Sequence, residues 1–285
     1  MSTTTVNSII ARCILDPRFL DALASNTEET LKEYALDEQE QRGFLSLDLR
    51  RIRYLAGFIT KIQNHDVIAE MAQTHTLLRH YDLELPVFSA YRETHQRMRA
   101  ANPGKREKVR AFVAFLKTYL ASLPPDSAPG LEDILNHEWL MWEASQSAGT
   151  QPPASGAGST DETPPERALD DLDELVPRMN GVFRVGVFEH DPLEIANQIA
   201  KSAFDSSRLC KDAGIWGYWG NPGSASVRLF RLDYGVLTVL QEITGSRTIG
   251  EIIRRLTAAA KSEITPEEVR SFFVTAFQSG LCRAT

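Results

Sequence analysis

Apolar residues recur every three or four positions through most of residues 1–145, with polar residues between them. This period places the apolar side chains on one face of a helix, where they pack into a core. Asp16-Pro17 has the chemistry of a helix start, and Asn102-Pro-Gly104 that of a helix stop. We therefore predict an all-helical N-terminal domain of about six helices, with one long helix over 37–62.

The pattern changes after residue 180. Val182–Phe188 and Ser226–Leu232 alternate between apolar and polar residues, as strands with one buried face do. Gly214–Gly220 is a further candidate strand, and Asn221-Pro-Gly-Ser224 has the residues of a hairpin turn leading to the next strand. These segments predict strands, two of which form a hairpin.

Three short helices are predicted after the last of these strands. Gly235–Ile243 has an apolar stripe at helical spacing, and Thr248 and Thr265 are each followed three residues later by a glutamate. That spacing is a capping box, in which threonine and glutamate each satisfy a free backbone N–H at a helix start. With the short extended tail Leu281–Cys282, the order becomes strand, three helices, strand, which is typical of a winged helix.

Residues 146–180 differ from both flanking regions. They begin with a low-complexity run of proline, glycine and serine and continue with a cluster of acidic residues. Such a segment buries too little apolar surface to offset the entropy of ordering it. The predicted fold class is therefore α+β, with a helical domain over 1–145, an acidic linker over 146–180 and a winged-helix domain over 181–285.

Composition narrows the class of protein. An apolar fraction of 42% and a charged fraction of 24% are typical of a soluble globular chain, and we find no signal peptide or membrane-spanning run. Cys13, Cys210 and Cys282 are far apart and lack metal-binding spacing, which predicts reduced thiols in a cytoplasmic protein. Residues 181–285 hold 12 Lys and Arg against 11 Asp and Glu, although a DNA-binding domain normally has a strong basic excess.

Catalytic chemistry is hard to find in the chain. The six histidines form no metal-binding or catalytic motif, and the sequence has no nucleotide-binding loop or nucleophile motif. Cys282 is interpreted as a small apolar residue in a closing strand. We therefore predict no catalytic, cofactor-binding or metal-binding residue, and no enzyme activity in this chain.

A binding role is the better hypothesis. If the strand that begins at Ser226 lies at the edge of its sheet, an extended peptide could pair with its backbone. The third helix would flank the resulting groove, and two arginines beside the edge would suit an acidic peptide. The predicted peptide-binding residues are Val227, Arg228, Leu229, Phe230, Arg231, Phe272, Phe273 and Ala276.

Two segments in this region carry a family resemblance. Thr244-Gly-Ser-Arg-Thr-Ile-Gly-Glu251 and Phe277-Gln-Ser-Gly-Leu281 resemble the PqqD-type RiPP recognition element, with Phe277 in place of the usual leucine. The resemblance covers only the stretch from Arg231 to Leu281. It implies that the domain binds the leader of a ribosomally synthesised precursor peptide as an added strand beside the third helix.

A helical domain joined to such an element is similar in layout to the non-catalytic partner subunits of multinuclear iron oxidases, although no motif in residues 1–145 carries this likeness. The resemblance implies a heterodimer with a TIM-barrel iron enzyme that matures a peptide natural product of the 3-thiaglutamate or methanobactin type. The iron would belong to the partner, with no cofactor in this chain, no nucleic acid and no membrane as a partner. Two alternatives stay open: a winged-helix transcription regulator, and a helical metalloenzyme subunit with a histidine–carboxylate site.

Overall fold

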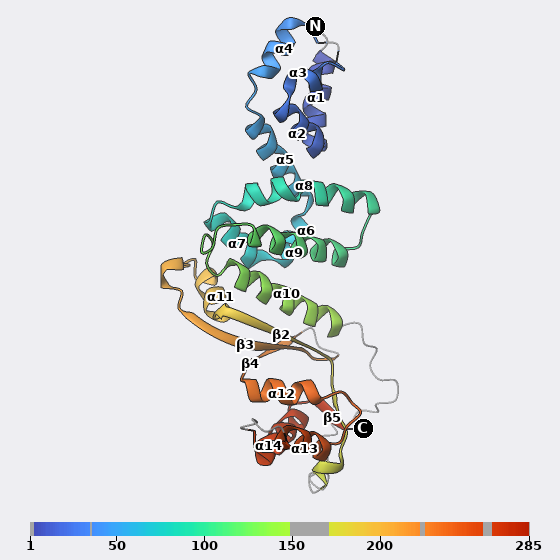
Figure 1. The fold of residues 1–285 in the computed structure, drawn as a ribbon, viewed down its shortest axis with the longest axis vertical. Coiled ribbons are helices and arrows are strands. Elements are labelled where there is room, and N and C mark those ends of the chain that lie inside the picture. Colours follow the sequence, from blue (N-terminus) through green and yellow to red (C-terminus); the bar gives the residue numbers. More distant parts are fainter. Residues whose placement is uncertain (1–2, 35, 149–170, 223–225, 259–263, 285) are drawn as a thin grey trace. The chain divides into compact units, whose positions relative to one another are not determined.

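The computed structural model describes residues 3–34, 36–148, 171–222, 226–258 and 264–284 (Figure 1). The protein is a mixed α+β chain with a small antiparallel sheet, as the sequence predicts. It divides into two compact units, Met1–Leu135 and Asn136–Thr285, and the division falls inside helix α10 (Leu131–Ala148).

All the regular elements described in the N-terminal unit are helices, joined by short turns. Its first four helices enclose a core that includes Ile9, Leu20 and Phe44. Farther along, Phe88 and Phe112 stack with ring centroids 5.5 Å apart, and Tyr91 meets Phe112 edge to face. The helices before α10 are α1 (Thr3–Leu15), α2 (Pro17–Ser25), α3 (Thr27–Leu31), α4 (Glu38–Leu45), α5 (Leu49–Gln63), α6 (His65–Glu70), α7 (Ala72–His80), α8 (Glu84–Ala101) and α9 (Lys105–Ala121).

In the N-terminal unit, several helix starts and ends agree with the sequence prediction, but the number of helices does not. Asp16 caps α2 by accepting from the backbone N–H groups of residues 18 and 19, and Asn102 ends α8 in the left-handed conformation. The single helix predicted over 37–62 is instead α4 and α5, because the Asp48 carboxylate caps a new helix start. Helix α1 was not predicted.

The C-terminal unit combines strands with short helices. Strands β2, β3 and β4 form an antiparallel sheet in that order, and β1 pairs with β5 in a separate two-stranded ladder. The elements after α10 are the 3-10 turn η2 (Leu172–Glu174), β1 (Pro177–Met179), β2 (Val182–His190), α11 (Pro192–Ala200), the 3-10 turn η3 (Ser206–Arg208), β3 (Lys211–Gly220), β4 (Val227–Leu232), α12 (Tyr234–Glu242), α13 (Ile249–Ala258), α14 (Pro266–Gln278) and β5 (Cys282–Ala284).

The three-stranded sheet is covered on both faces. Trp216 and Tyr218 of β3 point to one side, where they pack with residues of α10 such as Ala144. Trp219 points to the other side and joins a core formed with α12, α13 and α14, which includes Phe273. Figure 1 shows the same layers, with α10 on one side of the sheet and α12 on the other.

The predicted linker is shorter than expected at its C-terminal end. Leu172 is buried in the core of the C-terminal unit, and Asp173 forms a two-pronged ion pair with Arg270 of α14, with distances of 3.0 and 2.8 Å. Pro177–Met179 forms β1, which pairs with β5. Residues 171–180 therefore belong to the folded unit, because a few apolar anchors and one ladder order them despite their acidic composition. Residues 149–170 of the predicted linker lie outside the described residues.

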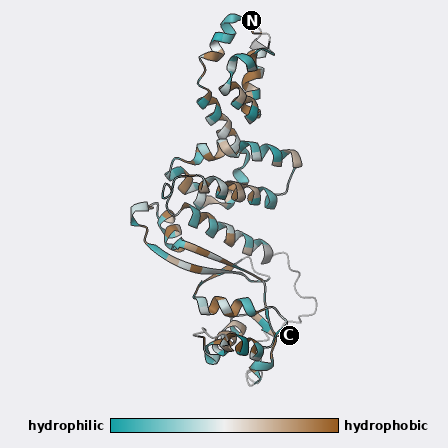
Figure 2. Cartoon of the chain, in the orientation of Figure 1, coloured by the Kyte–Doolittle hydropathy of each residue, from teal (hydrophilic) through white to brown (hydrophobic). Residues whose placement is uncertain are grey.

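The helices in the described segments are amphipathic. Figure 2 shows apolar and polar residues interspersed along them. None of them, over the residues described, has the length and apolar content needed to cross a bilayer.

Candidate functional site

Strand β4 lies at one edge of the three-stranded sheet. All six of its residues pair with β3, from Val227 opposite Gly220 to Leu232 opposite Ile215. Within the described part of the chain, no further strand pairs with the other side of β4. We call the backbone groups on that side the margin of β4; among the described residues they have no strand partner, which is the feature that strand addition requires.

The helices that follow β4 are fixed by the two predicted capping boxes. At the start of α13, the backbone N–H of Thr248 donates to the Glu251 carboxylate at 3.0 Å, and the backbone N–H of Glu251 donates to the Thr248 hydroxyl at 3.2 Å. Thr265 and Glu268 form the same two hydrogen bonds at the start of α14, at 2.8 and 3.3 Å. The backbone N–H and the hydroxyl of Thr265 lower the pKa of Glu268. These caps account for the sharp helix starts that the sequence predicts.

The end of α14 lies beside β4. The Arg228 guanidinium sits over the Trp219 ring, 5.3 Å from its centroid, and donates to the carbonyl of Ser279 at 3.4 Å. Phe230, two residues along the strand, packs against the core that α14 helps to form. These contacts place the C-terminal end of α14 on the face of the sheet that carries Trp219 and Arg228.

The predicted groove residues on α14 do not all reach the surface. Phe273 is 0% exposed and Ala276 is 2% exposed, so both belong to the core and cannot line an open groove. Phe272 is partly buried and packs edge to face against Phe273, with ring centroids 5.4 Å apart. Of the three α14 residues in the prediction, only Phe272 is accessible to a ligand.

The strand residues of the prediction lie on two faces. Val227 and Leu229 pack with the cluster on the α10 side of the sheet, whereas Phe230 packs on the α14 side. One guanidinium nitrogen of Arg231, Nη2, donates to both carboxylate oxygens of Asp212, at 2.9 and 2.8 Å, and this carboxylate compensates its charge. The positive charge predicted beside the margin is therefore smaller than the sequence indicates.

A buried polar pair in the same unit has no signal in the sequence. His137 of α10 is 6% exposed, and its Nδ1 atom lies 2.9 Å from the hydroxyl of Tyr218, which is 0% exposed. Burial lowers the pKa of His137 to about 4 and raises that of Tyr218, so both groups are neutral near pH 7. The pair joins α10 to β3 and lies away from solvent, which makes it a structural contact.

Two kinds of chemistry considered from the sequence, a reactive Cys282 and a metal site, are not found in the described residues. Cys282 is buried and its pKa is raised by burial to about 12, so its thiol is protonated near pH 7. Across the described segments, no three His, Cys, Asp or Glu side chains are grouped so that they could hold a metal ion.

Comparison of the chain with models of protein families and with curated proteins gave no match.

Proposed function

We propose that the C-terminal unit binds an extended peptide along β4 and presents it to a separate enzyme. The observation that carries this proposal is the edge position of β4, whose outer side pairs with no strand among the described residues. We assign β4, the three helices that follow it and β5 to the winged-helix class, in the form found in RiPP recognition elements. The peptide would be the leader of a ribosomally synthesised precursor.

Two kinds of contact would bind such a peptide. Main-chain hydrogen bonds to the margin would supply affinity independent of sequence, and side chains that alternate along the strand would supply selectivity. We assign the partly exposed Phe272 and the aliphatic stem of Arg228 as the apolar side chains that would contact the peptide. The chain itself makes and breaks no bond in this proposal.

The N-terminal unit would serve as the docking domain for a partner enzyme. That partner would be a TIM-barrel protein that carries its own iron, so the pair forms a heterodimer. Holding the peptide near the enzyme converts a bimolecular encounter into an intramolecular one, which lowers the barrier by several kcal/mol. An accessory chain without catalytic residues would then be required for activity.

A role in transcription is the main alternative, and the charges on α14 disfavour it. Glu267 and Glu268 occupy its first turn, and the guanidinium of Arg270 is paired with Asp173. A helix that enters the major groove needs cations free to reach phosphates. If the protein retarded promoter DNA in a gel-shift assay at low salt, the transcription role would be favoured over peptide binding. A metalloenzyme subunit is the other alternative, and a stoichiometric metal ion in the chain purified alone would support it.

Proline substitutions in β4 test the proposal. Adjacent residues of an edge strand direct their N–H groups alternately towards the paired strand and outwards. Arg228 and Leu229 are adjacent, so only one of them directs its N–H outwards. The proline variant at that residue removes the outward N–H donor and leaves the hydrogen bonds between β3 and β4 intact. We expect that variant to lose binding of the precursor peptide encoded near the gene, measured by calorimetry, while its thermal unfolding stays close to wild type.

Phe272→Ala provides a second variant that leaves the backbone unchanged. It should weaken peptide binding, whereas Val185→Ala, on the opposite edge strand β2, should leave the affinity unchanged. Wild-type affinity in both folded proline variants would contradict the assignment of β4 as the binding edge.

A further inference from the structure

The N-terminal unit has a cavity of about 480 Å³. The residues that line it belong to a different compact unit from β4. The cavity lies where the end of α5, the second half of α8 and the start of α9 meet. Its apolar lining includes Ile62, Tyr91 and Met98, and its charged lining includes Arg99 and Lys108. The volume is in the range typical of sites for small organic ligands.

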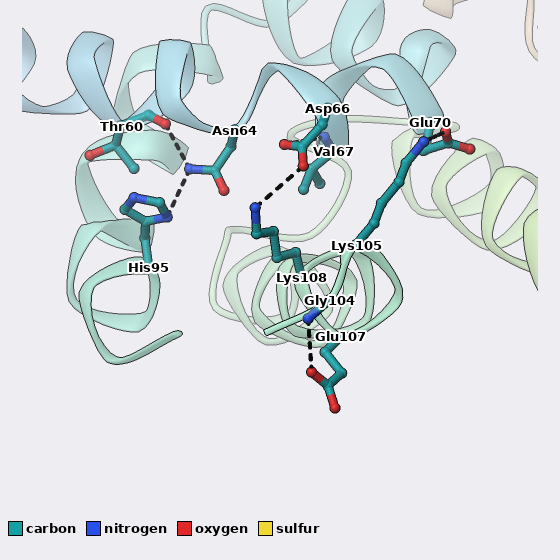
Figure 3. Close-up of polar contacts among 10 residues, drawn as sticks. All are labelled: Thr60, Asn64, Asp66, Val67, Glu70, His95, Gly104, Lys105, Glu107 and Lys108. Carbon is teal, nitrogen blue, oxygen red and sulfur yellow. Dashed lines mark hydrogen bonds and ion pairs between the residues drawn. The ribbon is translucent and has the colours of Figure 1, made fainter. Parts of the chain in front are cut away.

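One wall of the cavity is held rigid by amide side chains. The Asn64 amide nitrogen donates to the carbonyl of Thr60 at 2.7 Å and lies 3.0 Å from Nδ1 of His95 (Figure 3). Because an amide nitrogen is a donor, Nδ1 accepts, and the His95 proton resides on Nε2, which donates to Gln63 at 3.1 Å. Both ring nitrogens are therefore occupied, and His95 contributes a fixed, neutral surface.

The charged side chains that line the cavity are positive, and Asp66 beside the lining offsets part of this charge. No aspartate or glutamate is among the described residues that line it. Within the described chain, the Arg99 guanidinium makes no hydrogen bond or ion pair, and Lys108 has one long contact of 3.5 Å with Asp66 (Figure 3). The pKa of His95 is lowered by burial and, further, by Arg99 and Lys108, whereas the charge of Asp66 opposes part of the shift, so both cations act on the same wall.

The remaining lining includes apolar side chains and a buried phenol. Burial raises the pKa of Tyr91 to about 12, so its phenol carries no charge near pH 7. Ile62 and Met98 add aliphatic and thioether surface, and a flexible methionine adapts to planar groups. The lining therefore combines cations suited to an oxyanion with a surface suited to an apolar or aromatic body.

We propose that this cavity binds a small organic oxyanion, a carboxylate or phosphate carried on an aromatic body. The oxyanion would contact Arg99 and Lys108, and the aromatic body would lie against Ile62, Tyr91 and Met98. The site is independent of the peptide-binding proposal, because its residues belong to the other unit.

Calorimetry with the full chain at low salt tests the proposal with four probes. 1-Naphthyl phosphate and 1-naphthoate carry both features, 1-naphthol lacks the charge, and inorganic phosphate lacks the aromatic body. We expect at least one of the two naphthyl anions to bind at least about tenfold more tightly than either incomplete probe, since a charge-assisted bond to arginine contributes that much. The stronger of the two identifies whether the site prefers carboxylate or phosphate.

Variants locate the binding site. Arg99→Gln and Lys108→Gln should each weaken the binding of the preferred anion by about tenfold. Arg97→Gln is the matched control, because Arg97 is an exposed cation of the same helix that does not line the cavity. Ile62→Glu adds a negative charge at a lining residue that is 55% exposed, and should abolish binding without disturbing the core.

An NMR titration supplies a readout besides affinity. A bound anion offsets the field of the two cations, so it should raise the pKa of His95. The proposal is overturned by 1-naphthol binding as tightly as the anions, by no binding of either anion at millimolar concentration, or by equal weakening in the Arg97 and Arg99 variants.

Discussion

The buried His137–Tyr218 pair makes the stability of the C-terminal unit depend on pH. Burial lowers the pKa of His137 from 6.5 to about 4, although the charge of Asp191 opposes part of the shift. As pH falls below 6.5, the unfolded chain therefore binds a proton that the folded chain does not bind. Stability is lost progressively between pH 6.5 and about 4, and this group has no effect above that window.

The size of the effect follows from the shift. Each pH unit below the unfolded pKa costs about 1.4 kcal/mol, so lowering the pH from 7.5 to 5.0 should remove about 2 kcal/mol through His137. The interval stops at pH 5.0 because most carboxylates remain ionised there. In His137→Gln this component should vanish, leaving a flatter dependence on pH.

Urea unfolding followed by tryptophan fluorescence measures this quantity. All four tryptophans, Trp139, Trp142, Trp216 and Trp219, lie in the C-terminal unit, so the signal reports on that unit. His65→Gln, in the other unit, is the control and should keep the wild-type dependence on pH. If wild type and His137→Gln lose the same free energy of unfolding between pH 7.5 and 5.0, the buried, neutral state of His137 is refuted.

Three further predictions concern the same unit and the thiols. Phe273→Ala should cost about 3–5 kcal/mol of unfolding free energy in the urea assay, because it empties a fully buried position. Gly181→Ala should cost about 1–3 kcal/mol or more, because its φ is +98° and an added Cβ would lie 2.3 Å from a carbonyl oxygen of β3. In the native protein, Cys210 should react with a disulfide reagent at once, whereas Cys13 and Cys282 should react only on unfolding.

Each of these predictions has a matched comparison. Phe272→Ala should lower the unfolding free energy less than Phe273→Ala does, because Phe272 is only partly buried. Equal losses would contradict the deeper burial of Phe273. Gly214→Ala should be tolerated, because its nearest contact is an ordinary 3.5 Å, so an equal loss there would show that the strain at Gly181 is not the cause. Immediate reaction of every thiol would contradict the burial of Cys13.

Local sequence signals predicted the fold where the physical cause is local. The capping boxes at Thr248 and Thr265 and the Asp16-Pro17 start each depend on residues within one helical turn, and all three occur in the structure. The antiparallel pairing of β3 with β4 was likewise predicted, whereas Gly223 and Ser224 of the predicted turn lie outside the described residues. Such signals are reliable because the chain near them is enough to define the structure.

Features that depend on distant partners were missed. Strand β1 exists because Pro177–Met179 meets β5, about a hundred residues later in the chain, and Asp173 is held by Arg270. An acidic composition alone predicted a linker there. The cavity beside His95 likewise arises from three helices whose packing the sequence does not encode in any short motif.

The charges of the C-terminal unit show why peptide capture would depend on the backbone. The sequence count was nearly neutral, and the structure shows Arg231 paired with Asp212, and Arg247 and Arg255 paired with Glu242. Cations held by carboxylates within the same unit add little attraction for an acidic peptide, since exposed pairs already satisfy them. The unpaired backbone of β4 is different, because nothing in the described chain hydrogen-bonds its outer side as a strand. If the C-terminal unit binds a peptide as we propose, main-chain pairing, with apolar contacts to Phe272, would therefore be the main source of affinity.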